Sequence, residues 1–165
     1  MKIVIASLLA LAAAQDQPPA MAPAAQLNAI EMDINSWGRV VARWSIDARG
    51  NGRYTLPEPE AMNPKRLVTR SFAAGSGGFR RVRILLGRAE ARMGRQMPCA
   101  QRITDMHYGT VHWQRRDGRA NALGYDMGCR EYATRQVLDD IVKANAIVAG
   151  WAKDGPVVET EEVGS

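Results

Sequence analysis

The sequence predicts an α+β fold in which antiparallel β-hairpins form one sheet, or two similar sheets, with two helices packed on one face. Three observations support this expectation. Alternating polar and apolar residues indicate half-buried strands, glycine-containing turns join these strands into hairpins, and two longer stretches repeat apolar residues at helical spacing. Because runs of strands are twice followed by a helix, the pattern favours helices segregated on an antiparallel sheet.

The first half of the chain begins with predicted strands. Residues 30–34 alternate between apolar and acidic side chains, and residues 40–46 are rich in β-branched and aromatic ones. The second strand is expected to meet residues 53–56 across the turn Arg49-Gly50-Asn51-Gly52, in which Asn51-Gly52 is a dipeptide typical of tight hairpins. Three prolines then interrupt the chain, and residues 65–72 complete the group as a fourth strand.

A glycine-rich turn at residues 73–78 is predicted to lead into the first helix, with Ser76 as its N-cap. The helix follows from apolar residues spaced three and four apart, while arginines occupy its other faces. The apolar positions are Phe79, Val82, Leu85, Leu86, Ala89 and Met93.

The second half repeats this plan. A short strand begins at residues 103–105, and residues 110–116 and 119–125 form a hairpin across Asp117-Gly118. A long amphipathic helix follows. Its apolar stripe is expected to contain Tyr132, Val137, Leu138, Ile141, Ile147, Val148 and Trp151.

The two halves also share short sequence echoes. Residues 37–40 (WGRV) resemble residues 108–111 (YGTV), and each follows an acidic residue, Asp33 or Asp105. The echoes favour duplication of a strand–strand–helix unit. Two unrelated hairpins also share such patterns, so both interpretations stay open.

Residues 103–105, the hairpin from Trp113 to Gly118 and the last helix, which ends in Trp151, resemble uncharacterised exported proteins of proteobacteria. The resemblance covers about the second half of the chain. It implies an exported protein with this type of fold and carries no activity with it.

The N-terminus has the pattern of a cleavable export signal. Lys2 precedes a short apolar stretch and the alanines at 12–14, which form a small-residue cleavage site, and the stretch is too short to span a bilayer. We expect a signal peptide at 1–14, a flexible lead-in at 15–25, one domain at 26–155 and a disordered acidic tail at 156–165. These segments predict a periplasmic or secreted protein with no membrane anchor after cleavage.

Two cysteines, Cys99 and Cys129, remain in the expected mature chain. An even cysteine count in an exported protein favours a disulfide bond, and the alternative is a pair of buried free thiols. The bond would tie the start of the second strand–helix unit to the beginning of its last helix.

The formal net charge is +5, and the acidic tail makes the rest of the chain more basic still. The bases are mostly arginines, which suit contacts with anionic partners such as phosphate or anionic glycans. Coding bias and solubility explain the same composition. Nucleic acid is not an expected partner because an exported protein rarely meets it.

Residues 74–78 (AGSGG) form the most catalytic-looking motif, since they resemble a nucleophile elbow between a strand and a helix. Ser76 would be the nucleophile and His107 or His112 its base. The domain is much smaller than an α/β-hydrolase, and turn and cap chemistry explains the same residues. We therefore predict no catalytic activity. The candidates for orienting the base would be Asp105, Asp117 and Asp126.

The same loop is a candidate anion site. Backbone N–H groups of Gly77 and Gly78 would point outward at a helix N-terminus, beside Arg80 and Arg81. The loop lacks the lysine of a P-loop, so a plain helix start is the alternative.

The sequence predicts no metal site and no cofactor. Asp105, His107 and His112 are the only metal-like cluster, and histidines five apart on a strand point to opposite faces. The four tryptophans are expected mainly in the core, although tryptophan also lines ligand grooves and interfaces.

These features predict an exported, non-enzymatic envelope protein that binds a protein or a small anionic ligand. The binding surface would be the free face of the sheet or the loop at residues 75–78. The alternatives are a small serine hydrolase built on Ser76 and an envelope stabilising or assembly factor.

Overall fold

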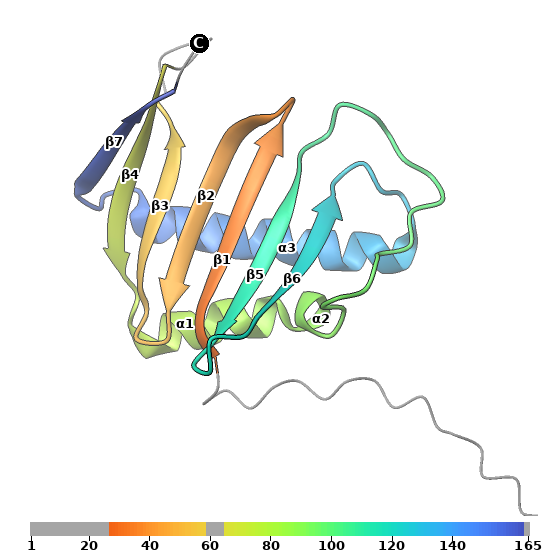
Figure 1. The fold of residues 1–165 in the computed structure, drawn as a ribbon, viewed down its shortest axis with the longest axis horizontal. Helices are drawn as coiled ribbons and strands as arrows, with labels where there is room; N and C mark the ends of the chain where they lie inside the picture. Colours follow the sequence, from red (N-terminus) through yellow and green to blue (C-terminus); the bar gives the residue numbers. More distant parts are fainter. Residues whose placement is uncertain (1–26, 59–64, 164–165) are drawn as a thin grey trace, which may run out of the picture.

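The computed structural model describes residues 27–58 and 65–163, which form one sheet with helices on one side (Figure 1). The first four strands precede the first two helices, two strands precede the long helix, and one strand ends the fold. The elements are β1 (Leu27–Ser36), β2 (Arg39–Asp47), β3 (Asn51–Pro57), β4 (Arg66–Ala73), α1 (Gly75–Leu85), α2 (Gly87–Glu90), β5 (Tyr108–Arg115), β6 (Ala120–Asp126), α3 (Tyr132–Ala152) and β7 (Val157–Glu162).

The seven strands form a single sheet in the order β6-β5-β1-β2-β3-β4-β7, and every neighbouring pair is antiparallel. All three helices lie on the same face, and α1 packs against α3 (Figure 1). The predicted α+β class is confirmed. A duplicated unit is not shown, because four strands precede the first helices and only two precede α3.

The hydrophobic core lies between the sheet and the helices. On β1 and β5, Ile30 is the register partner of Trp113 and Met32 that of Val111, and all four side chains are buried. The predicted helix stripes largely hold. Phe79, Val82, Leu86 and Ala89 are buried on the α1–α2 segment, and Val137, Leu138, Ile141 and Val148 are buried on α3. Tyr132 is an error in the predicted stripe, since its side chain is 79% exposed at the start of α3.

Both predicted hairpin turns exist, but one is shifted. Gly118 has φ +80° and its N–H donates to the Arg115 carbonyl, as expected for a turn at Asp117-Gly118. The other turn lies in the first half of the predicted segment 49–52 and not at its Asn51-Gly52 dipeptide, because the positive φ (+87°) belongs to Gly50 and β3 already begins at Asn51. The Asp47 carboxylate explains the shift, since it accepts the N–H groups of Arg49 and Asn51.

The acidic C-terminal segment is not the disordered tail that its composition predicted. Residues Val157–Glu162 form β7, which pairs with β4 at one edge of the sheet (Figure 1). Two ion pairs help to hold it, from Arg53 to Glu159 at 3.3 Å and from Arg43 to Glu161. Composition indicates disorder only when the charges lack partners, and here the partners come from β2 and β3.

Two local predictions about the first helix and the second half are also wrong. Ala74 caps α1 and Ser76 lies inside its first turn, so the serine makes no capping hydrogen bond. Residues 103–105 form no strand, and a single bridge between Arg102 and Cys129 is the only strand-like pairing found in that segment.

The predicted disulfide bond is confirmed. Cys99 and Cys129 are joined with their Cα atoms 5.4 Å apart, and Cys129 lies three residues before α3 begins. The bond ties the segment between α2 and β5 to the connection between β6 and α3.

The predicted signal peptide and lead-in lie outside the described residues. Within residues 27–58 and 65–163, none of the helices combines the length and the hydropathy that crossing a bilayer requires.

Candidate functional site

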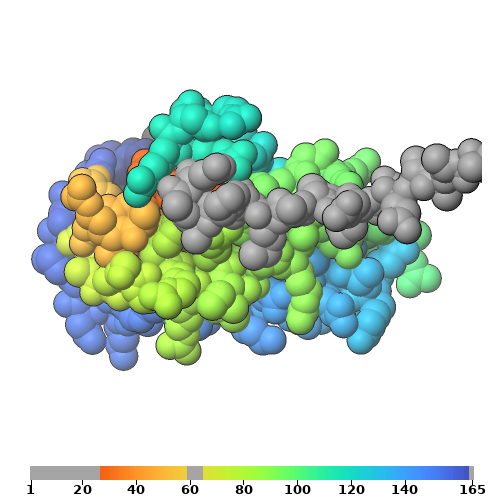
Figure 2. Space-filling model, turned by 90° about the horizontal axis from the view of Figure 1, so that it is seen from below, coloured from red at the N-terminus to blue at the C-terminus, as the bar shows by residue number. Residues whose placement is uncertain are grey.

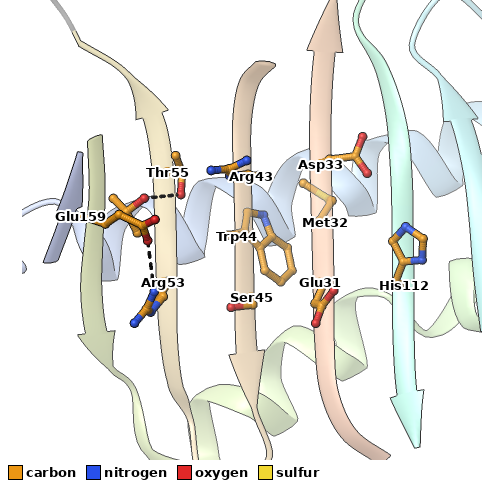
Figure 3. Close-up of a pocket in the computed structure, with 11 residues that line it drawn as sticks. Glu31, Met32, Asp33, Arg43, Trp44, Ser45, Arg53, Thr55, His112 and Glu159 are labelled. Atoms are coloured by element: carbon orange, nitrogen blue, oxygen red, sulfur yellow. Dashed lines mark hydrogen bonds and ion pairs between the residues drawn. The ribbon is translucent and has the colours of Figure 1, made fainter. Parts of the chain in front are cut away.

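The structure does not bring the candidate catalytic residues together. Ser76 lies on α1, on the helix-covered side, whereas His112 lies on the opposite, open face of the sheet (Figures 1 and 3). His107 directly precedes β5, whose first residue pairs with the end of β1, while α1 begins at the other end of the sheet. A serine and a base must lie within hydrogen-bond reach to act together, and neither histidine meets that condition with Ser76.

The orienting carboxylates and the metal-like cluster are dispersed as well. Asp117 holds Arg119 in the β5–β6 turn, and Asp126 pairs with Arg102 at 3.2 Å. Asp105 is exposed in a left-handed conformation with φ +65°. Among the described residues, no group of three histidine, cysteine, aspartate or glutamate side chains is placed to hold a metal ion.

The tryptophans divide between the core and the surface. Trp44 and Trp113 are buried, and Trp151 packs its ring 6.0 Å from that of Phe72. Trp37 is 77% exposed at the β1–β2 turn, and neither residue type nor spacing predicted an exposed aromatic residue at this position.

A polar hollow of about 410 Å³ lies on the open face of the sheet (Figure 3). Cross-strand register places Glu31 on β1 between His112 on β5 and Ser45 on β2. Beside them, the hydroxyls of Thr55 and Thr69 are 2.8 Å apart and both residues are buried. The hollow is therefore a structured surface with hydrogen-bonding groups contributed by several strands.

The charges of this hollow do not favour an anionic ligand. Arg43 and Arg53 already pair with Glu161 and Glu159 of β7. Among the charged side chains that line the hollow, this pairing leaves the carboxylates of Glu31 and Asp33 without an arginine. An added anion would have to displace an existing glutamate or approach these two carboxylates.

A second surface has the opposite character. At one end of the sheet lie the β2–β3 turn and the β5–β6 turn. Together with α1, α2 and the turn that follows α2, they share one side of the molecule (Figure 2). The hydrogen bond from the Gly94 N–H to the Ala122 carbonyl, at 3.1 Å, fixes the last of these segments against β6. We call this surface the basic end. Its exposed or half-buried arginines that form no ion pair within the described residues are Arg49, Arg80, Arg81, Arg92 and Arg116.

The carboxylates at the basic end are already engaged. Glu90 is buried against Arg83, and Asp140 pairs with Arg88 at 3.2 Å. Asp47 accepts backbone N–H groups in its turn. Hydrogen bonds from Arg119 lower the pKa of Asp117, so this carboxylate stays ionised and paired. The five unpaired arginines therefore lack a competing internal anion and give this end a positive potential.

The anion site predicted at the start of the first helix is only partly supported. Gly78 is buried and its N–H donates to the Ala74 carbonyl at 3.2 Å, so this group is not available to an anion. Gly77, Arg80 and Arg81 do lie on the exposed side of α1. The sequence did not show that three more arginines from distant segments join them, because only the tertiary fold brings the two turns to the end of the sheet at which α1 begins.

No protein-family model, curated protein or solved structure matches this chain.

Proposed function

We propose that this protein is an exported, non-enzymatic binding protein of the cell envelope whose basic end contacts an anionic partner. The observation that carries the proposal is the gathering of five arginines without carboxylate partners from four segments of the chain. Arginine suits this role because its planar guanidinium binds phosphate and carboxylate groups in a bidentate manner.

Export supports the choice of partner. The Cys99–Cys129 bond is of the kind that persists in oxidising compartments, which agrees with the signal pattern at residues 1–14 and with a periplasmic or secreted location. In such a compartment the abundant anions are the phosphates and acidic sugars of the envelope. Nucleic acid is correspondingly not the partner we propose.

The proposal also assigns no chemistry to Ser76. Its hydroxyl is far from both histidines in the fold, and its place in the first turn of α1 needs no catalytic explanation. We expect a fluorophosphonate probe to leave the protein unlabelled. Labelling that disappears in both Ser76→Ala and a histidine variant would support the serine hydrolase instead.

Binding to heparin, a soluble polyanion, tests the basic end directly. We expect Arg80→Gln/Arg81→Gln to weaken binding by about tenfold or more, and we expect added salt to weaken the binding of the wild type. The matched control is Lys65→Gln/Arg130→Gln, which removes the same charge from exposed positions outside the basic end. If the two double variants lost heparin affinity equally, net charge alone would explain the binding, and the proposal would be contradicted.

A further inference from the structure

The basic end contains an apolar groove as well as arginines. The groove has a volume of about 430 Å³ and lies between α1 and α3. Ile84 at its rim is 72% exposed, which is unusual for an isoleucine on a helix that already buries its opposite side. The groove is lined by Gly77, Arg80, Arg81, Ile84, Leu85 and Ile147.

The spacing along α1 explains why charge and apolar surface meet here. Arg80 and Arg81 lie three and four residues after Gly77, and Ile84 lies four and three residues after them. This spacing places the four residues along one side of the helix. Gly77 has no side chain and leaves open space at its Cα, so one end of the groove is not filled. The result is an apolar strip flanked by two guanidinium groups that have no carboxylate partner.

We infer that this groove docks the protein on the surface of an anionic phospholipid membrane. Ile84 and the groove take up the acyl region near the headgroups, and Arg80 and Arg81 bind the lipid phosphates. The inference rests on the proposed function, since it uses the same arginines, and it adds the class of partner.

The combination of groups distinguishes a membrane from other anions. A soluble phosphate or an anionic glycan would bind the arginines but would gain nothing from Ile84, Leu85 and Ile147. A phospholipid surface presents phosphate and hydrocarbon within a few ångströms of each other, which matches the side-by-side arrangement on α1.

The test compares vesicles of phosphatidylglycerol with vesicles of phosphatidylcholine and with heparin. We expect the full chain to bind phosphatidylglycerol vesicles and not phosphatidylcholine vesicles. Ile84→Ser should weaken vesicle binding by about tenfold, because it removes an apolar side chain that the membrane would bury. The same substitution should leave heparin binding unchanged. Val142→Ser is the matched control, since Val142 is also an exposed aliphatic residue, 53% exposed, on the α3 surface and outside the groove.

The possible outcomes separate the two proposals. Heparin binding without vesicle binding, or vesicle binding that Ile84→Ser does not change, would overturn the membrane inference and leave the proposed function standing. Equal losses in Ile84→Ser and Val142→Ser would also overturn it. Failure to bind either heparin or phosphatidylglycerol vesicles would remove the proposed function and the inference together. Retained heparin binding by Ile84→Ser shows that this variant is folded.

Discussion

The two ends of the sheet have different surfaces. The basic end presents five arginines that form no ion pair within the described residues, and its two hairpin turns place glycine at positive φ, at Gly50 and Gly118. The opposite end, which we call the tryptophan end, contains the β1–β2 turn, the segment at residues 99–107 and the start of β5. There Trp37 itself has φ +52°, and the Gly38 N–H donates to the Tyr108 hydroxyl at 3.1 Å.

The difference shows that net charge describes this protein poorly. The tryptophan end exposes large apolar side chains beside Arg39 and Arg102, and Arg102 is paired with Asp126. A disulfide bond holds the segment that leads to this end. Its exposed large apolar residues are Trp37, Ile103, Met106 and Tyr108. The two ends therefore offer separate surfaces to partners of different chemistry, and four predictions test how each end is held together.

The largest expected effect is on the tryptophan end. Replacing both cysteines, Cys99→Ser/Cys129→Ser, should lower the free energy of unfolding by about 3–4 kcal/mol, because the bond closes a loop with a sequence separation of 30. Urea denaturation measures the loss. Hydrogen exchange should become faster at residues 99–107 and stay unchanged in the β2–β3 turn of the basic end. Equal melting of oxidised and reduced protein would contradict the prediction.

The buried ion pair at the basic end gives the next largest effect. Arg83 and Glu90 are 8% and 2% exposed and are joined by two hydrogen bonds of 3.1 and 3.2 Å. Glu90→Gln should cost about 3 kcal/mol, because it removes the negative charge that is paired with a buried guanidinium. Arg80→Gln, an exposed arginine of the same helix, is the control and should change stability by less than about 0.5 kcal/mol. If both variants lost a similarly small part of the free energy of unfolding, the Arg83–Glu90 pair would not stabilise the fold, and the prediction would be wrong.

Alkaline pH should weaken the tryptophan end through a buried tyrosine. Burial raises the pKa of Tyr125 well above its ordinary value, and its hydroxyl donates to the Asp33 carbonyl at 2.7 Å. The unfolded chain therefore loses this proton at a lower pH than the folded chain does. The contribution of Tyr125 to the free energy of unfolding is fully present below about pH 10 and falls by about 1.4 kcal/mol per pH unit as the pH rises above it. Tyr125→Phe should reduce this slope in urea denaturation. Burial also raises the pKa of Tyr54, so a smaller slope should remain.

The smallest expected effect concerns backbone strain in the turns. Trp37→Asn should raise stability by about 1 kcal/mol, because asparagine tolerates positive φ and an exposed tryptophan contributes little packing. Gly118→Ala at the basic end should lower stability by about 1 kcal/mol, because alanine is strained at the positive φ that Gly118 adopts. Thermal unfolding measures both. Destabilisation by Trp37→Asn would mean that the indole makes a stabilising contact.

Features that depend on nearby residues were predictable. The hairpin at Gly118 follows from a dipeptide signal, and the helix stripes follow from spacing that a single helix imposes on its own residues. The shift of the other turn was not predictable, because the Asp47 carboxylate competes with the Asn51-Gly52 signal through hydrogen bonds to the backbone. Ser76 failed as a cap because α1 begins one residue before it.

The sequence by itself determined the fold class, the strand and helix periods and the pair of cysteines that join, because each depends on local pattern or on there being only two thiols. The tertiary structure decided the rest. Glu159 and Glu161 become part of a strand only because Arg53 and Arg43 on other strands meet them. Arg49 and Arg116 belong to the same surface only because two turns that are distant in the sequence lie at the same end of the sheet. Charge pairing acts through space, so the chain order alone cannot show which arginines remain unpaired.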